Sequence, residues 1–218
     1  VERRQTLPVL SNVLLDLKEG ELSLTGTDLE VELVGRVIVD QAHISGAVTV
    51  PARKLLDICK SLSDDANIEL SLTDNKVTLK SGRSRFTLTT LPASEFPAVD
   101  DQPDTFAITM AQSKLRDLLD STSFAMAQQD VRYYLNGMLF EVARDFLRVV
   151  ATDGHRLAME TFNTTNPISE PQQFILPRKG IVEMARLLTD DSGEISLTFG
   201  QNNIRASVPF FTFTSKLV

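Results

Sequence analysis

The sequence predicts an α+β protein made of two tandem domains of one fold, with antiparallel sheets on one side and helices on the other. Three observations predict it: an internal repeat, apolar residues at helical spacing at equivalent points of both copies, and alternating apolar and polar residues elsewhere. The chain has 218 residues, of which 42% are hydrophobic and 23% charged. That composition is typical of a folded protein with a core in each copy.

The repeat is a shared pattern with little sequence identity. Residues 22–28 align with 147–153, and both segments end on Thr-Asp. Residues 50–54 and 176–179 share a proline before basic residues, and residues 62–65 and 188–191 share an Asp-Asp pair. Residues 85–88 and 212–215 share the pattern of a closing strand.

Both copies predict an amphipathic helix directly after the proline, because apolar residues recur there at i, i+3, i+4 and i+7. These positions are Leu55, Ile58, Cys59 and Leu62 in the first copy and Ile181, Met184, Ala185 and Leu188 in the second. The spacing places Cys59 on the apolar face, so we expect a small core residue rather than a nucleophile or a ligand.

Period-two alternation predicts antiparallel strands around residues 68–72, 77–79 and 86–88, with turns at 74–75 and 81–82. The second copy also starts with a strand at 106–110 and a helix from Ser113 to about Phe124. The first copy has no counterpart, since Val1 aligns with Met126. By its own repeat, the chain is expected to lack roughly 20 residues at its start.

Residues 91–104 are rich in proline and acidic residues and predict an interdomain linker. We therefore expect a first domain over residues 1–104 and a second over 105–218.

The net charge of −7 argues against nucleic acid as a partner only if the basic residues are spread evenly. They are not, because each predicted helix after a proline carries three basic residues against one acidic residue. These are Arg53, Lys54 and Lys60 against Asp57, and Arg178, Lys179 and Arg186 against Glu183. The repetition favours one positive surface that faces a polyanion, with ordinary solvated helix faces as the alternative.

A single cysteine, no apolar run of roughly 18 residues and no apolar stretch behind the N-terminal charges favour a cytoplasmic protein with no membrane segment. With His43 and His155 as the only histidines and no ligand-spaced pairs, we expect no metal and no other cofactor.

A series of ordered motifs resembles the bacterial replicative sliding clamp family, the beta subunit of DNA polymerase III. They lie at residues 6–12, 26–30, 50–54, 81–86, 129–137, 151–157 and 213–218. The resemblance implies DNA clamp domains, of which the full-length protein has three. It also implies a homodimer ring whose helices line the hole and whose sheets form the rim.

The resemblance further implies a protein with no chemistry of its own. Such a ring encircles double-stranded DNA without reading its sequence and holds the replicative polymerase near its template by raising the effective concentration. Its localisation is then cytoplasmic and nucleoid-associated. Domain 3 is expected to be absent from this chain, which would prevent ring closure and weaken peptide binding.

The resemblance assigns DNA contact to Arg4, Arg53, Gln129, Tyr133 and Tyr134. Arginine can pair with phosphate, glutamine can donate from a loop, and tyrosine offers a hydroxyl or a stacking face. Taken alone, the Tyr133-Tyr134 pair favours strand packing. The repeat adds three basic residues, Lys54, Arg178 and Lys179.

The family's second site is a cleft that takes short apolar peptides from the polymerase, the clamp loader and repair proteins. Such a cleft needs apolar walls and a few polar groups for the peptide backbone. The resemblance assigns its second-domain wall to Leu135, Thr152, Gly154, His155, Arg156 and Leu157.

Two alternatives stay open. A hydrolase could use Asp153 to orient His155 as a general base, although no serine or cysteine lies in a recognisable nucleophile setting. A truncated clamp could act only as a peptide-binding interaction module. Since Thr-Asp occurs in both copies, as Thr27-Asp28 and Thr152-Asp153, we expect these two residues to build a turn.

Overall fold

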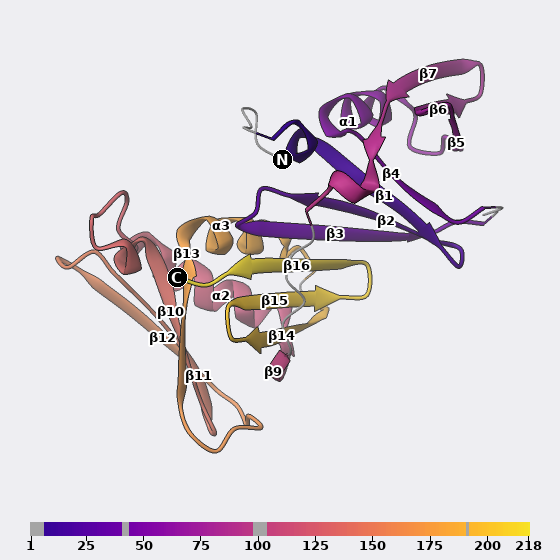
Figure 1. The fold of residues 1–218 in the computed structure, drawn as a ribbon. Helices are drawn as coiled ribbons and strands as arrows, with labels where there is room; N and C mark the ends of the chain where they lie inside the picture. Colours follow the sequence, from indigo (N-terminus) through magenta and orange to yellow (C-terminus); the bar gives the residue numbers. More distant parts are fainter. Residues whose placement is uncertain (1–6, 41–43, 98–103, 191) are drawn as a thin grey trace. The chain divides into compact units, whose positions relative to one another are not determined.

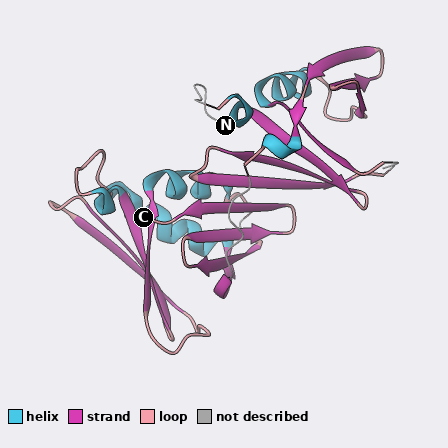
Figure 2. Ribbon diagram, in the orientation of Figure 1, coloured by secondary structure: helices cyan, strands magenta, loops and turns pink. Residues whose placement is uncertain are grey.

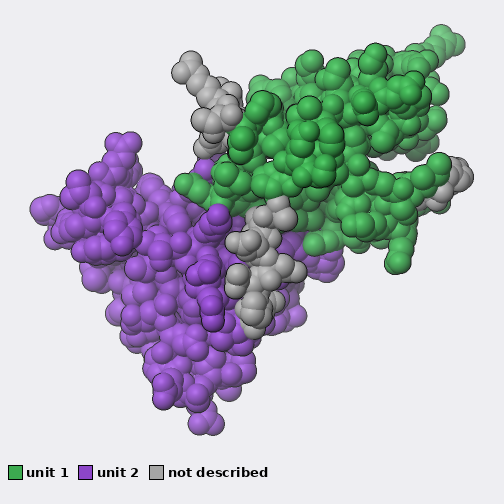
Figure 3. Space-filling view, viewed as in Figure 1, with its two compact units in different colours: residues 1–99 green, residues 100–218 purple. Residues whose placement is uncertain are grey.

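The computed structural model describes residues 7–40, 44–97, 104–190 and 192–218. The chain divides into two compact units, Val1–Val99 and Asp100–Val218 (Figure 3). The predicted domain boundary after residue 104 stays a prediction, because residues 98–103 are not described. Both units combine antiparallel sheets with helices, which confirms the α+β class (Figure 2).

Unit 1 has two antiparallel sheets among its described residues, with strand orders β8-β4-β1-β2-β3 and β5-β6-β7 (Figure 1). Helix α1 contacts β1, β4 and β7, so it joins both sheets. The elements are η1 (Pro8–Ser11), β1 (Asn12–Lys18), β2 (Glu21–Thr27), β3 (Val31–Ile38), β4 (Gly46–Pro51), α1 (Ala52–Ser61), β5 (Glu69–Thr73), β6 (Lys76–Ser81), β7 (Ser84–Thr89), β8 (Leu91–Pro92) and η2 (Ala93–Glu95).

Unit 2 has sheets of order β12-β11-β10-β13 and β16-β15-β14-β9, with α2 and α3 in contact with each other. Its elements are β9 (Asp104–Ala111), α2 (Gln112–Thr122), η3 (Ser123–Ala125), η4 (Tyr133–Asn136), β10 (Gly137–Ala143), β11 (Phe146–Thr152), β12 (Leu157–Asn163), β13 (Gln172–Pro177), α3 (Arg178–Leu187), β14 (Glu194–Gly200), β15 (Asn203–Val208) and β16 (Phe211–Lys216).

The element order from β1 to β7 repeats from β10 to β16, which confirms the internal repeat. Both predicted helices begin directly after their prolines, since Pro51 caps α1 and Pro177 caps α3. The strand β9 and the helix α2 have no counterpart among the described residues of unit 1.

That difference decides how deeply equivalent apolar residues are buried. In unit 2, β14 pairs with β9, and Leu197 opposite Ile108 is 0% exposed. The equivalent Leu70 in β5 is 38% exposed, because β5 has only β6 as a strand neighbour among the described residues. The neighbouring Ile68 and Leu72 are exposed as well, although their alternation predicts one covered face.

Cys59 corrects one sequence-based prediction. The helical spacing places it on the apolar face of α1, but in the structure its side chain is exposed. The described part of unit 1 does not cover all apolar side chains of α1, since Leu56 on the same helix is also 46% exposed.

An exposed thiol should react while the protein is folded. We expect the single cysteine to be fully modified by a thiol-specific chromogenic reagent in buffer, at a rate close to that in urea. Protection of the thiol until the protein unfolds would contradict its exposure, and a Cys59→Ser variant provides the blank.

Candidate functional site

A closed turn joins β11 to β12 and holds most of the predicted cleft residues. The Oγ1 of Thr152 donates to the carbonyl oxygen of Arg156 over 2.7 Å and accepts from the amide of Gly154 over 3.1 Å. One carboxylate oxygen of Asp153 accepts from the amides of His155 and Arg156 over 2.9 and 3.0 Å. These side chains replace strand partners for the backbone of the turn.

Unit 1 contains the same turn between β2 and β3. Thr27 donates to the carbonyl of Val31 over 2.8 Å and accepts from the amide of Leu29 over 3.1 Å. Asp28 accepts from the amides of Glu30 and Val31, each over 3.0 Å. The prediction that Thr-Asp builds the turn in both copies is confirmed.

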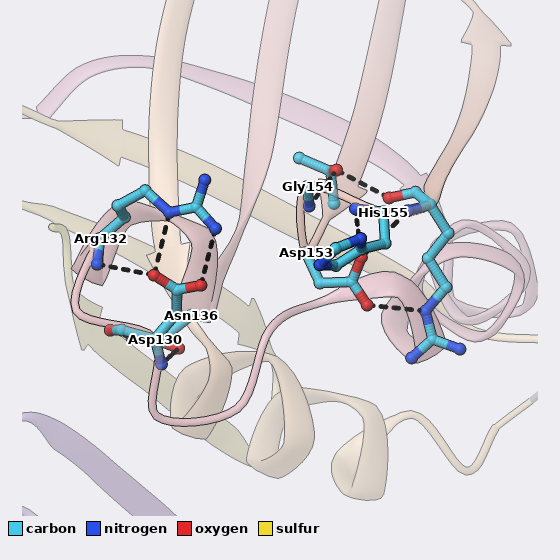
Figure 4. Close-up of polar contacts among 8 residues, drawn as sticks. Asp130, Arg132, Asn136, Asp153, Gly154 and His155 are labelled. Carbon is cyan, nitrogen blue, oxygen red and sulfur yellow. Dashed lines mark hydrogen bonds and ion pairs between the residues drawn. The ribbon is translucent and has the colours of Figure 1, made fainter.

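The geometry of Asp153 differs from that of a catalytic dyad. Its second carboxylate oxygen accepts from Nε of Arg156 over 3.0 Å, so both oxygens contact the backbone or the guanidinium (Figure 4). The amide of His155, followed by that of Arg156, holds the pKa of Asp153 below its ordinary value. The carboxylate is thus ionised and used by the turn, whereas the hydrolase hypothesis requires it to orient the imidazole.

Arg156 has a second contact that the sequence did not indicate. Its guanidinium carbon lies 5.6 Å from the ring centroid of Phe124, which follows α2 and is 58% exposed. Asp153 and Phe124 together restrict where the guanidinium can lie. Only the tertiary structure brings Phe124 to Arg156, and no sequence spacing predicts that contact.

A compact loop over residues 129–136 lies before β10. The carboxylate of Asp130 accepts from the backbone amide of Arg132 over 2.8 Å and from its Nε and Nη2 over 3.0 and 2.8 Å. Asn136 accepts from the amide of Asp130 over 2.9 Å and donates Nδ2 to its carbonyl oxygen over 2.8 Å (Figure 4). The loop is therefore closed by its own side chains.

The predicted DNA-contact residues of this loop point outward. Gln129 is exposed and has a left-handed backbone with a φ of 57°. Tyr133 and Tyr134 are 69% and 47% exposed and lie in η4, so the strand-packing alternative is wrong. The predicted cleft residue Leu135 is half-buried, and its amide donates to the carbonyl of Arg132 over 2.8 Å.

The other predicted DNA-contact residues differ in exposure. Arg53 and Lys54 are exposed on α1, and Nε of Arg53 lies 3.6 Å from Oδ1 of Asp57. Arg178 and Lys179 are half-buried at the start of α3, where Arg178 donates to the carbonyl of Met126 over 3.5 Å. Arg4 lies outside the described residues.

The six predicted cleft residues all belong to unit 2. Five of them lie in or beside the β11–β12 turn, where Thr152 pairs with Leu157, which is 63% exposed. Leu135 belongs to the 129–136 loop, and a Cβ built on Gly154 would lie 3.3 Å from Nη2 of Arg132 in that loop. The loop and the turn therefore adjoin, which the sequence alone did not establish.

The Asp130 contact predicts a response of the loop to acid. Hydrogen bonds from Arg132 lower the pKa of Asp130 from 3.8 to about 2, so the folded loop favours the ionised carboxylate. This contribution should be constant above about pH 4 and be lost as the pH falls through about 2. A carboxyl carbon titration of Asp130 by NMR should show it, and a midpoint near 4 would contradict the contact.

In the part of the chain that the structure describes, no helix is long and apolar enough to cross a membrane. Among the same residues, no group of three or more histidine, cysteine, aspartate or glutamate side chains could hold a metal ion.

Comparison with known proteins gives the family. Residues 1–100 match the family model of the DNA polymerase III beta subunit, N-terminal domain, and residues 109–218 match that of its central domain. The chain is 62% identical over 218 residues to the beta sliding clamp of Pseudomonas aeruginosa and 50% identical to that of Escherichia coli. It covers 59% and 58% of these two relatives, so it spans less than two thirds of their length.

The fold agrees with these sequences. The crystal structure of the DNA polymerase III subunit beta from Pseudomonas aeruginosa superposes with a TM-score of 0.97 at 61% identity, over 100% of this chain and 59% of that one. The fold class of tandem clamp domains predicted from the sequence is therefore confirmed. On the match of two successive family models along its length, the chain belongs to the DNA polymerase III beta subunit family.

Proposed function

We propose that this chain supplies two domains of a sliding clamp, a ring-shaped homodimer in its full-length form that encircles duplex DNA and tethers the replicative polymerase. Membership of the DNA polymerase III beta subunit family carries the proposal. The clamp works without chemistry of its own, because holding an enzyme on its template raises its effective concentration there. Its place is the cytoplasm, at the nucleoid.

The DNA contacts in this proposal are independent of sequence. Arg53 and Lys54 are exposed cations that can meet phosphates, and such contacts exchange readily with counterions. Gln129, Tyr133 and Tyr134 project from the closed 129–136 loop and offer hydrogen bonds or ring faces without base-edge readout. Arg4, Arg178 and Lys179 complete the proposed set.

The proposed partner site is the surface around the β11–β12 turn. Exposed Leu157 and half-buried Leu135 offer apolar contacts, and Arg156 offers a charged donor whose position Asp153 and Phe124 restrict. An extended apolar peptide needs this combination of apolar anchors and fixed polar groups. The occupants would be clamp-binding segments of the polymerase, the clamp loader and repair proteins.

DNA retention tests the first half of the proposal. The chain, extended to the full length of its relatives, should remain on nicked circular DNA after loading by a clamp loader and should leave linear DNA through its ends. Equal retention on both forms would indicate ordinary DNA binding and would contradict encirclement. A charge-reversed Arg53→Glu, Lys54→Glu variant should lower loading and its dependence on salt.

Peptide binding tests the second half. A labelled Gln-Leu-x-Leu-Phe-type peptide should bind the full-length protein far better than this chain. Arg156→Ala should weaken peptide binding by both proteins. Equal affinity of the two proteins would contradict a cleft shared with a further domain. A protein that binds the peptide but is not retained on DNA would instead favour a role as a peptide-binding interaction module. The proposed peptide-contact residues of this chain all lie in unit 2.

A further inference from the structure

The conformation of the turn does not by itself explain why residue 154 is glycine. The equivalent turn in unit 1 has the same hydrogen bonds but carries Leu29 in the place of Gly154. Both residues have left-handed backbones, with φ of 77° at Leu29 and 87° at Gly154. Since unit 1 forms this turn with a leucine, backbone conformation alone does not require glycine at residue 154.

The surroundings of Gly154 supply the missing reason. A Cβ built there would lie 3.3 Å from Nη2 and 3.4 Å from Nη1 of Arg132, whereas Leu29 has room for a full side chain. The guanidinium of Arg132 thus approaches the turn at the point where a side chain would stand (Figure 4). A leucine in place of Gly154 would displace it.

Arg132 is held in that place from the loop side. Its backbone amide and two of its guanidinium nitrogens donate to Asp130, and the paired contacts of Nε and Nη2 fix the plane of the group. Asn136 closes the loop around Asp130. The guanidinium of Arg132 is therefore paired with the Asp130 carboxylate of the loop, and it lies close to the turn at Gly154.

We propose that Arg132 is a positioning residue that fastens the 129–136 loop to the β11–β12 turn through Gly154. The consequence for partner binding rests on the proposed function. Arg132 keeps Leu135, whose amide donates to the carbonyl of Arg132, at a fixed distance from Arg156 and Leu157. A partner peptide that contacts both segments then meets one preformed surface and orders fewer groups on binding.

Hydrogen exchange tests the fastening without any ligand. Arg132→Ala and Gly154→Leu should each speed amide exchange in the loop by about tenfold, because each separates the loop from the turn. The double variant should exchange no faster than the faster single variant, since Arg132→Ala already removes the guanidinium that Gly154→Leu displaces. Leu29→Gly, the reverse exchange in unit 1, should leave the 129–136 loop unchanged.

Two results would overturn the fastening: unchanged loop exchange in Gly154→Leu, or effects that multiply in the double variant. If Gly154→Leu does not fold, Gly154→Ala serves instead and should give a smaller increase in loop exchange, because its Cβ needs the guanidinium to move by only a few tenths of an ångström.

Peptide affinity tests the consequence. In the full-length protein, each single variant should weaken binding of the Gln-Leu-x-Leu-Phe-type peptide by about threefold to tenfold, and the double variant no further. Faster loop exchange with unchanged affinity would overturn the stated consequence. If the unmodified full-length protein binds no peptide, the proposed partner site is wrong, while the exchange cycle still decides the role of Arg132.

Discussion

Replacing Leu197 by alanine should lower the free energy of unfolding of unit 2 by about 2–5 kcal/mol, whereas Leu70→Ala should cost unit 1 less than about 1 kcal/mol. The two leucines occupy the same position of the repeat, opposite Ala206 on β15 and Leu79 on β6. Leu197 is completely buried and its strand β14 is paired with β9 as well as β15, so the substitution leaves a cavity. Leu70 is 38% exposed, so much of the lost surface already faces water.

Urea denaturation followed by a separate probe in each unit measures both variants against the unmodified chain. The comparison is matched, since residue, substitution and place in the fold are the same. A loss at Leu70 as large as that at Leu197 would mean that something covers β5 in solution.

The repeat also shows why burial was the part of the fold that the sequence predicted least well. Periodicity indicates which residues share a face, and it identified the strands with Leu70 and Leu72 and the helix with Cys59. Whether that face is covered depends on another element. Because β9 and α2 precede only the second copy in the described chain, equal patterns have different burial in the two units.

The turn was predictable because its cause is local. Thr152 and Asp153 bond to backbone amides and a carbonyl two to four residues away, and Thr27 and Asp28 do the same, so a dipeptide shared by two copies was sufficient. Arg132 and Phe124 were not predictable in this way. Their contacts with Gly154 and Arg156 join segments that are distant in sequence. The only sequence signal was that glycine replaces leucine at one position of the repeated turn.

Asp153→Ala should abolish the fixed geometry of the turn and weaken binding of the Gln-Leu-x-Leu-Phe-type peptide by about tenfold or more. The carboxylate fixes two backbone amides and Nε of Arg156, so its removal frees both the turn and the charged donor that the peptide site would use. Fluorescence anisotropy of the labelled peptide, with the full-length protein as host, measures the loss.

Asp28→Ala is the control that the repeat provides. It removes the same two backbone contacts from the equivalent turn, so it should destabilise unit 1 in the same way. Peptide affinity should nevertheless stay within about twofold, because the proposed cleft residues all lie in unit 2. Equal loss of affinity in both variants would place the peptide elsewhere. An Asp153→Asn variant should lie between, since its side-chain oxygen still accepts from the amides while the charge opposite Arg156 is gone.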